Sequence, residues 1–599
     1  MAKLQTEPVF VPENALGIKL NFPEQFLDKA MSPYSRNMEY VNGVLAGRSG
    51  LTKFETTQLK GNVMLMEQFT KFNDDSYFMV CTDKDIMYYD FTNTYFVYLN
   101  KLYQTGLCKI GTGASSLIVT GTSTSWMSNV SAGDYFKLGT GSLNSDANWY
   151  EIASVDTGTQ ITLVSAPTGS TNQGYTIRKL FTGQTGSALA DFWYSTVFQD
   201  EVLGETWVAT NGVDVPVRWV GSGQVIDVDT SCMTAARFVT TFKDRLHWLN
   251  TTEGGFAQPQ RIRWSAVANI GTNSAVDFVD FVENQTDITG VVEFSNYLAI
   301  LKEEGARIGR YVGGTAIFDF EISTVPVGCR APHSIINNGD DIYYYGSDSK
   351  FHRWNFLREE DVSTDILPWT KDFDPNLDPF IYGWTVPSKN QIRWFVPHGT
   401  TSYNNHIVVF DYEQNILEIW DTAQEKALCC MGEYIRTTDT FFDDAILGEE
   451  YLDEHIDYFD DVTSVDNSSV LVYGSYDGYI READSGTQDD GSDYTRDFKT
   501  KRLDFRYPVL EKRLWKQEWA FNTEPSGSSV SLYMRKGDNT TDETEIKTID
   551  LTSSTKDVIR PEVTWDKTDY NFQFELKSTN HFELIGFLNY WFGKGKTFR

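Results

Sequence analysis

The ionisable side chains of this chain are most concentrated between residues 437 and 493, where 13 aspartates and four glutamates accompany a single basic residue, Arg481. This segment carries half of the formal net charge of −32. Carboxylates at such density are typical of a solvated loop, of a cation site, or of a surface that repels nucleic acid. The candidate residues are Asp443, Asp444, Glu449, Glu450, Asp453, Glu454, Asp457, Asp460 and Asp461.

The spacing of the acidic residues helps to distinguish a solvated loop, a cation site and a surface that repels nucleic acid. A calcium-type site needs oxygen ligands at regular intervals, as in DxDxDG, and the acidic segment has no such run. Phe441, Phe442, Tyr451 and Phe459 are interspersed with the acids, which argues against plain disorder. Two interpretations stay open: a loop whose apolar side packs on the fold, or an acidic wall that faces DNA. A wall with the same sign as phosphate gives a moving duplex no binding minimum.

The sequence does not show the patterns expected for catalysis or cofactor binding. The seven histidines have neither HxH nor HExxH spacing and the six cysteines form no CxxC pair, so we expect no metal site. Asp477 and Gly478 resemble a fragment of the sialidase Asp box, but the Thr-Trp that normally follows is missing. The many adjacent carboxylates cannot be assigned as acid and nucleophile from sequence. We therefore expect no catalysis and no cofactor, with a glycan hydrolase as the enzyme alternative.

The elements that must position these residues are short strands. The stretch from Ser469 to Gly486 has a β-branched and aromatic run, a turn around Gly474 to Gly478, and a second apolar run, which together predict a hairpin. Similar strand pairs recur upstream at intervals of about 40 to 65 residues, the period of four-stranded propeller blades. Aromatic residues make up 14% of the chain and glycines number 45, which favours an all-β protein. We expect a β-propeller.

Composition divides the chain into five parts. Residues 1–60 read as an N-terminal arm and 61–104 as the first part of the propeller. Residues 105–180 are rich in Gly, Ser and Thr and predict a small β-barrel or sandwich that interrupts the first blade. The propeller continues over 181–484, and alternating strands over 485–599 predict a C-terminal β-sandwich.

A basic strip follows the acidic segment at the start of the predicted sandwich. In alternating strands about half of its side chains would face solvent or a partner. Because neighbouring regions have opposite charge, the strip predicts docking against an acidic face of the next subunit, with an ordinary solvated sandwich face as the alternative. The residues are Lys499, Lys501, Arg502, Arg506, Lys512 and Arg513.

Four segments, in their order along the chain, resemble the tail nozzle (tail hub) proteins of short-tailed bacteriophages. They are NMEYVNGVLAGRSGLTKF with its Arg48-Ser49-Gly50 element, TGTSTSWMSNVSAGDYFKL followed by WYEIASVDTGTQITL, RLHWLNTTEGGFAQPQRIRWSAV, and YGSYDGYIREADSG leading into DFKTKRLDFRYPVLEKRLWK. The third is similar to that family's blade with a PxRxRWS element, here Pro259, Arg261, Arg263, Trp264 and Ser265. The long acidic insertion departs from the family pattern.

The resemblance implies a structural role in a virion. Nozzle subunits assemble into a ring, typically hexameric, below the portal and adaptor proteins, and the central channel conducts double-stranded DNA without sequence-specific binding. A heterologous interface with closed cyclic symmetry makes such a ring. The implied partners are further copies of the chain, the portal-adaptor proteins, and tail fibres or spikes. The implied activity is genome retention and ejection.

Two alternatives and a location complete these expectations. The chain could instead be a monomeric propeller adhesin that binds host glycan through aromatics such as Tyr343, Tyr344 and Tyr345, or a tail-associated glycan hydrolase. The opening residues MAKLQTEPVFVPEN hold no apolar core of signal-peptide length, and no run of about 18 uncharged apolar residues occurs. We expect a protein made in the host cytoplasm for the virion tail, with no membrane span.

Overall fold

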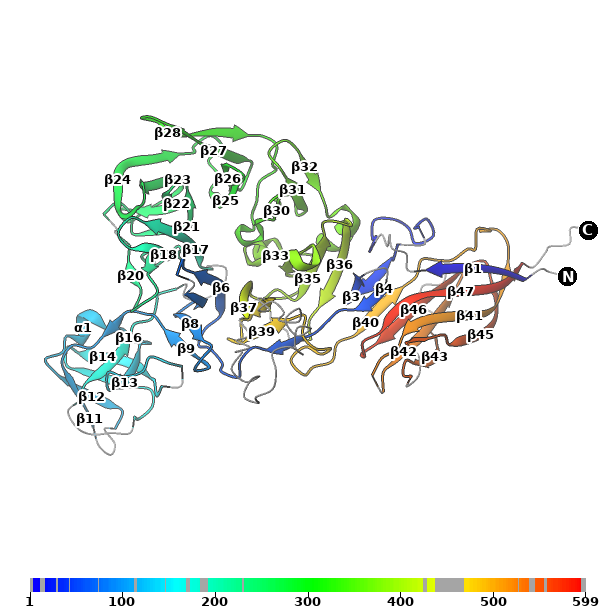
Figure 1. Ribbon diagram of the computed structural model, residues 1–599, viewed down its shortest axis with the longest axis horizontal. Coiled ribbons are helices and arrows are strands. Elements are labelled where there is room, and N and C mark those ends of the chain that lie inside the picture. The colour runs from blue at the N-terminus through cyan, green and yellow to red at the C-terminus, as the bar shows by residue number, and fades with distance from the viewer. Residues whose placement is uncertain are drawn as a thin grey trace, which may run out of the picture.

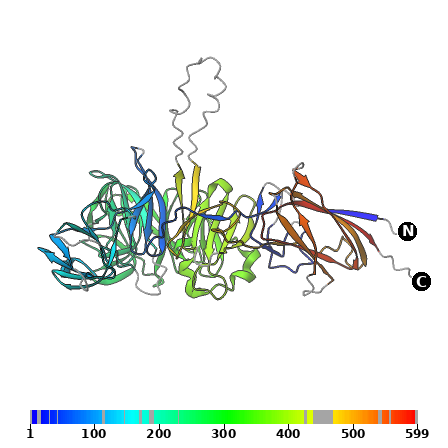
Figure 2. The same cartoon turned by 90° about the horizontal axis from the view of Figure 1, so that it is seen from below.

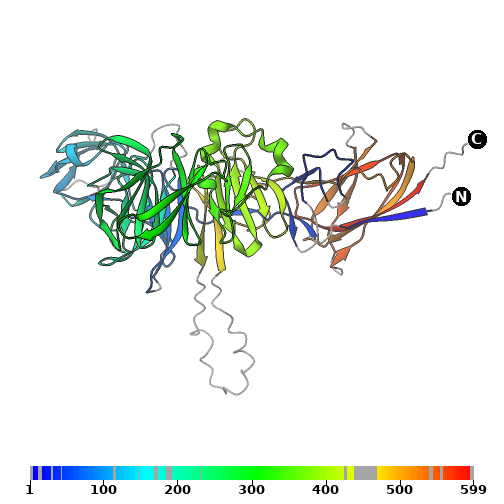
Figure 3. The same cartoon turned by 90° about the horizontal axis from the view of Figure 1, so that it is seen from above.

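A computed structural model describes residues 4–10, 17–28, 31–41, 44–73, 75–111, 116–145, 147–167, 173–183, 192–228, 231–423, 428–436, 468–525, 527–537, 544–553 and 557–593. These residues form an all-β protein, as the sequence predicts. A β-propeller occupies one part of the long axis and a β-sandwich the other, and the first and last strands, β1 (Leu4–Phe10) and β47 (Glu583–Gly593), both lie in the sandwich (Figure 1). Side views show the two bodies in one row (Figures 2 and 3). No helix in the described ranges is long and apolar enough to cross a membrane.

The described residues of the propeller form seven antiparallel four-stranded sheets, numbered here as blades 1 to 7. Blade 1 holds β6 (Val63–Thr70), β7 (Ser76–Thr82), β8 (Ile86–Asp90) and β9 (Tyr95–Tyr98). Blade 2 holds β17 (Tyr194–Asp200), β18 (Gly204–Thr210), β19 (Val217–Trp219) and β20 (Ile226–Asp227). Blade 3 holds β21 (Ala235–Phe242), β22 (Arg245–Glu253), β23 (Phe256–Ala266) and β24 (Asn269–Asp280). Blade 4 holds β25 (Ile288–Phe294), β26 (Tyr297–Lys302), β27 (Ala306–Gly313) and β28 (Ile317–Ser323).

The remaining blades carry the short helices of the propeller. Blade 5 holds β29 (Ile336–Asn337), β30 (Ile342–Tyr345), β31 (Phe351–Trp354) and β32 (Glu359–Asp361). Blade 6 holds β33 (Tyr382–Val386), β34 (Gln391–Val396), β35 (His406–Asp411) and β36 (Ile416–Asp421). Blade 7 holds β37 (Cys430–Arg436), β38 (Ser468–Gly474), β39 (Ile480–Ala483) and β5 (Leu51–Lys53). The helical turns are η2 (Pro332–Ser334), η3 (Thr364–Ile366), α2 (Leu367–Thr370), η4 (Pro375–Phe380) and η5 (Pro387–Lys389).

Blade 7 is completed by a strand from the other end of the sequence. β5 pairs with β39 through Arg481 opposite Lys53 and Ala483 opposite Leu51. The innermost strand of this blade, β37, packs against β6 of blade 1. Gly432 on β37 permits this approach, because a Cβ there would lie 2.2 Å from the Met66 carbonyl oxygen. The ring of blades therefore closes through contacts between residues far apart in sequence.

The burial pattern of a strand depends on whether other parts of the protein cover one face of its sheet or both faces. All six residues of β34 and all four of β30 are buried, because neighbouring blades cover both faces of a middle strand. Along β41 (Lys512–Asn522) of the sandwich, buried positions alternate with more exposed ones, as expected where one face meets the core and the other faces outward.

The inserted module lies between blades 1 and 2. It comprises β10 (Leu102–Tyr103), β11 (Leu107–Ile110), β12 (Ile118–Thr122), α1 (Trp126–Asn129), β13 (Tyr135–Leu138), β14 (Tyr150–Thr157), β15 (Gln160–Leu163) and β16 (Tyr175–Arg178). These strands make one sheet around a core of its own that contains Trp126 and Phe136. The sequence interpretation placed the module inside the first blade. This placement differs from the structure, in which β6 to β9 complete blade 1 before the module begins.

The sandwich combines N-terminal and C-terminal strands. Its first sheet holds β1 (Leu4–Phe10), β3 (Met38–Val41), β4 (Val44–Gly47), β41 (Lys512–Asn522), β44 (Val558–Ile559), β45 (Glu562–Asp569) and β47 (Glu583–Gly593). Its second sheet holds β2 (Tyr34–Arg36), β40 (Arg496–Lys499), β42 (Ser529–Lys536), β43 (Thr544–Asp550) and β46 (Phe572–Ser578). The predicted N-terminal arm is thus distributed between the sandwich and blade 7, because its short strands complete sheets that the rest of the chain leaves open.

Candidate functional site

The chain crosses between propeller and sandwich twice, and the two crossings lie against each other. The first crossing is Arg48 to Gly50, between β4 and β5, and the second runs from Asp484 to Thr495, between β39 and β40. Backbone hydrogen bonds join them: Gly50 N donates to Gly486 O (2.8 Å) and Leu51 N to Gln488 O (2.9 Å). The contact is closest at Gly50, where a Cβ would lie 2.1 Å from Gln488 O. We call this paired segment the junction.

A buried ion pair fastens the junction. The Arg48 guanidinium forks onto Asp489, with Nη1 to Oδ1 at 3.0 Å and Nη2 to Oδ2 at 2.7 Å. The two side chains are 2% and 0% exposed. The remaining Arg48 donors reach Asn37 Oδ1 and the carbonyls of Ser49 and Asp421. Every N–H of this buried cation is therefore satisfied, which is the condition under which such a pair is tolerated.

A second buried arginine ties the junction to blade 6. Arg393 on β34 is fully buried and forks onto Asp484, at 3.1 Å and 2.9 Å. Its Nη1 also donates to the Tyr473 hydroxyl of blade 7 (2.9 Å). Burial lowers the pKa of Arg393, but the charge interaction with Tyr473, and then the charge of Asp484 and its hydrogen bonds, outweigh burial and raise the pKa above its usual value, so the group stays charged. The second crossing is consequently held to two blades as well as to Arg48.

Two carboxyl groups meet where β3 of the sandwich touches β36 of blade 6. Glu39 accepts from Lys389 Nζ and Gln391 Nε2, both at 3.1 Å, and Glu418 Oε1 accepts from the Tyr40 backbone N–H at 2.9 Å. Burial, and then repulsion from Glu39, raise the pKa of Glu418 well above its usual range. Asp411 adds to this repulsion and Arg393 opposes it. Glu418 therefore keeps its proton at a pH where an exposed glutamate is ionised.

This protonation predicts how pH affects stability. The native state holds the Glu418 proton after the unfolded state has released it near pH 4.5, so the free energy of unfolding falls as pH rises above that value. Glu418→Gln should flatten the decline and stabilise the protein at pH 8 by about 1 kcal/mol or more. Urea denaturation between pH 4 and pH 9 measures both effects.

The control for this experiment is Glu413→Gln. Glu413 lies on the exposed turn of the same hairpin. The substitution makes the same Glu-to-Gln change at a solvated position, so the pH dependence of the wild-type protein should persist. Identical slopes in Glu418→Gln and wild-type protein would show that Glu418 is ionised in the native state.

The hub of the propeller is filled by aromatic rings from three blades. The His333 ring, in η2 before blade 5, lies 4.3 Å from Phe192, 4.2 Å from Tyr194 and 5.3 Å from Tyr382, measured between centroids. Phe192 and Tyr194 lie at the start of blade 2, and Tyr382 begins blade 6. Burial holds the pKa of His333 well below its usual range, so the ring is neutral. At this level the hub is packed protein, not a channel.

The nine predicted channel acids, from Asp443 to Asp461, lie outside the described residues. The described strands on either side of them, β37 and β38, pair antiparallel with Arg436 opposite Ser468. Arg436 and Ser468, the described residues that flank 437–467, therefore lie side by side at one end of blade 7.

At least five members of the basic strip contact their own chain. Lys499 Nζ lies 3.1 Å from Glu575, and Arg502 Nε lies 2.9 Å from Glu24. Lys501 Nζ donates to the Leu27 carbonyl.

The fourth is Lys512, which is 0% exposed and donates to the Tyr570 carbonyl at 2.6 Å. Burial lowers its pKa to about 8. Arg506 and Arg513 are exposed, and Arg513 pairs with Asp566. The two lysines, the arginine and Lys512 described above donate to acceptors on neighbouring parts of the same chain. Arg506 and Arg513 are the members of the strip whose side chains face solvent. Docking of the strip against another subunit stays a prediction for them.

The segment that resembles the PxRxRWS element fastens the strands of blade 3. Arg263 forks onto Glu253 at 3.0 and 2.9 Å, and Arg261 forks onto Asp280 at 2.7 and 2.8 Å. Ser265 Oγ accepts from the Leu246 N–H at 3.0 Å. These contacts join β22, β23 and β24, so the element serves the blade itself.

Residues considered for glycan recognition have structural contacts instead. Tyr343, Tyr344 and Tyr345 are 1%, 0% and 0% exposed, so their proposed display to a glycan is wrong. They lie on β30, a middle strand covered on both faces. Asp477 pairs with Arg481 at 2.9 Å and accepts from the Tyr479 N–H at 3.1 Å, which fixes the turn between β38 and β39.

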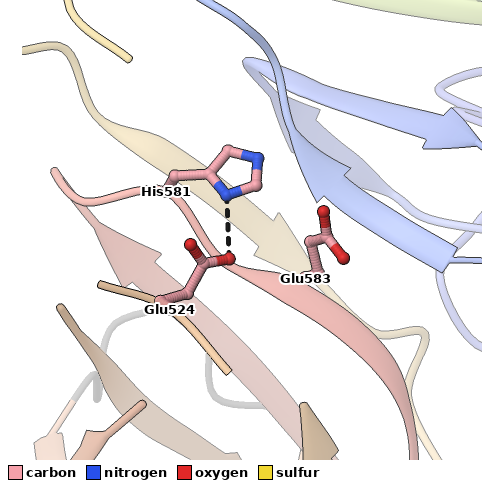
Figure 4. Close-up of side chains that lie close together, drawn as sticks. All are labelled: Glu524, His581 and Glu583. Carbon is pink, nitrogen blue, oxygen red and sulfur yellow. Dashed lines mark hydrogen bonds and ion pairs between the residues drawn. The ribbon is translucent and has the colours of Figure 1, made fainter. Parts of the chain in front are cut away.

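One group of side chains has the composition of a metal site. Glu524, His581 and Glu583 each place a ligand atom within 4.8 Å of the others. His581 Nδ1 lies 2.8 Å from Glu524 Oε1, and Glu583 comes from the neighbouring strand β47 (Figure 4). Inspection of histidine spacing missed this group because Glu524 lies 57 residues from His581. The local signal was His581 and Glu583 at alternate positions, which places both side chains on one face of an extended segment.

Comparison with known proteins yields fold-level likeness alone. No family model and no curated protein matches the chain. One similar structure is PorZ, an essential surface component of the type-IX secretion system of Porphyromonas gingivalis, which is 12% identical to this chain with a TM-score of 0.27. The match covers 69% of this chain and 44% of PorZ, so the chain spans less than half of PorZ. A catalytically inactive virginiamycin B lyase from Staphylococcus aureus is 12% identical with a TM-score of 0.25 over 58% of this chain and 95% of the lyase. Neither likeness bears on activity.

Proposed function

We propose that this protein is a structural subunit of a bacteriophage tail, a nozzle or hub ring that extends the DNA channel below the portal-adaptor complex. The observation that carries the proposal is the junction: two chain crossings, bonded to each other and fastened by Arg48 and Asp489, hold two large domains as one body. A subunit that must keep its shape while a genome passes needs such coupling. The ordered resemblance of four segments to nozzle proteins supports the same role.

The channel in this proposal lies between copies of the chain. The packed rings around His333 leave the hub of a single propeller unsuited to a duplex. An elongated subunit, with the propeller at one end and the sandwich towards the other, suits a heterologous contact between unlike ends, which closes into a ring when the rotation is appropriate (Figure 1). The surplus negative charge of the chain, −32 in total, would then repel passing phosphate.

Light scattering coupled to size exclusion, with negative-stain imaging of the peak, tests this proposal. The protein, alone or with its adaptor, is expected to form a closed ring of many copies around an axial lumen. A stable monomer of 68.1 kDa in the presence of the adaptor would overturn it. Retention on a host-glycan array would then favour an adhesin, and release of reducing ends from host polysaccharide would favour a tail-associated hydrolase.

A further inference from the structure

We propose that Glu524, His581 and Glu583 bind one divalent transition-metal ion, with Zn²⁺ as the reference ion, next to the junction. Glu524 follows β41, while His581 precedes β47 and Glu583 begins it. The three ligand atoms lie within 4.8 Å of one another, close enough for small side-chain movements to bring them onto one ion. Zn–N and Zn–O bonds are each about 2.0–2.2 Å long.

The donor set selects the class of ion. One imidazole nitrogen and two carboxylates suit Zn²⁺, Mn²⁺ or Fe²⁺, whereas Ca²⁺ and Mg²⁺ prefer oxygen alone. Two carboxylates beside a neutral imidazole carry two negative charges, which a divalent ion balances. In the present arrangement a proton must lie between His581 Nδ1 and Glu524 Oε1, since the atoms are 2.8 Å apart. An ion bound at Nδ1 takes the place of that proton, which moves to Nε2 of the neutral imidazole. Protons compete with the ion for all three ligands, so binding weakens at acid pH.

Partial burial strengthens the case for a built site. The His581 and Glu524 side chains are 22% and 9% exposed, so their charges are incompletely solvated. Glu583 is oriented by Asn522, whose amide donates to its Oε2. This is the kind of outer contact that orients a metal ligand. Three ligands leave coordination positions for water.

The neighbouring arginine, Arg496, directs its hydrogen bonds to other groups and not to Glu524 or Glu583. Arg496 donates to the carbonyls of Thr579, Arg48 and Thr487 and to the Tyr494 hydroxyl. It approaches β4 at Gly47, where a Cβ would lie 2.4 Å from the Arg496 side chain and 3.4 Å from His581 Cδ2. Gly47 immediately precedes Arg48. A bound ion would therefore tie the end of β41 to the start of β47 beside the first crossing.

Isothermal titration calorimetry with Zn²⁺ and absorption spectroscopy with Co²⁺ test the site in full-length, chelator-treated protein. We expect one ion per chain, a visible Co²⁺ band, and a rise in melting temperature that EDTA reverses. Both His581→Gln and Glu583→Gln should weaken binding at least tenfold. Their melting temperatures in EDTA should equal that of the wild type, which separates ligand loss from misfolding; Glu524→Gln provides a third variant that can still hydrogen-bond with His581.

A matched control is available in blade 5. His352 also contacts two carboxylates, Asp348 through Nε2 at 2.8 Å and Glu359 through Nδ1 at 3.3 Å. These acids lie on opposite ring nitrogens and cannot share one ion with the imidazole, so His352→Gln should leave the stoichiometry at one. Absence of binding at millimolar Zn²⁺, or binding unchanged in all three site variants, would overturn the proposal. These experiments measure metal binding and do not depend on ring assembly. A protein that fails to bind metal could still form the ring, so the two proposals are tested separately.

Discussion

Arg48→Met is expected to lower the free energy of unfolding by about 3–5 kcal/mol, because it leaves a desolvated carboxylate without its guanidinium partner. Asp489 is 0% exposed and receives two N–H bonds from Arg48. Loss of Arg48 also removes its stacking on Tyr494, whose ring centroid lies 3.7 Å from the guanidinium carbon. Urea denaturation followed by tryptophan fluorescence measures the loss. Limited proteolysis should cut the variant within residues 484–495 sooner than the wild type.

Arg513→Met is the matched control for this experiment. Arg513 also pairs with an aspartate, Asp566, but the two side chains are 51% and 61% exposed. Exposed pairs contribute about 0–1 kcal/mol, so this variant should be nearly as stable as the wild type. Adding Asp489→Asn to Arg48→Met neutralises the stranded carboxylate and should recover part of the loss. Equal losses in Arg48→Met and Arg513→Met would contradict a buried electrostatic fastening at the junction.

Gly432→Ala is expected to destabilise the closure between blades 7 and 1 by about 1–3 kcal/mol, the usual cost of overpacking. The new Cβ would lie 2.2 Å from the Met66 carbonyl oxygen and 2.7 Å from its carbonyl carbon. These are backbone atoms of β6, so no rotamer change can make room and the blades must separate. Thermal unfolding monitored by near-ultraviolet circular dichroism reports the effect, and Gly432→Val should lose more.

Gly158→Ala supplies the comparison for the closure. Gly158 lies in the turn between β14 and β15, and a Cβ there would meet nothing within 4 Å. The same substitution in open space should change stability by less than about 0.5 kcal/mol. If Gly432→Ala were equally silent, blades 7 and 1 would not be in the close contact that the structure shows.

Local patterns in the sequence were sufficient to predict the repeated strand pairs of the propeller. The hairpin predicted from Ser469 to Gly486 corresponds to β38 and β39, because alternating apolar residues and turn glycines act over a few neighbours. The same rule located the module near residues 105–180, against β10 to β16 at Leu102–Arg178. It did not identify the four complete strands of blade 1, β6 to β9.

The sequence by itself determined that this chain is an acidic, all-β protein with propeller repeats, since composition and short-range periodicity are properties of neighbouring residues. The tertiary structure alone decided how the repeats close and which charges meet. Arg48 finds Asp489 across 441 positions, and Glu524 finds His581 across 57, so no spacing rule could pair them. Burial of Tyr343 to Tyr345 likewise depends on blades stacking over both faces of β30, a contact that the strand's own residues do not encode.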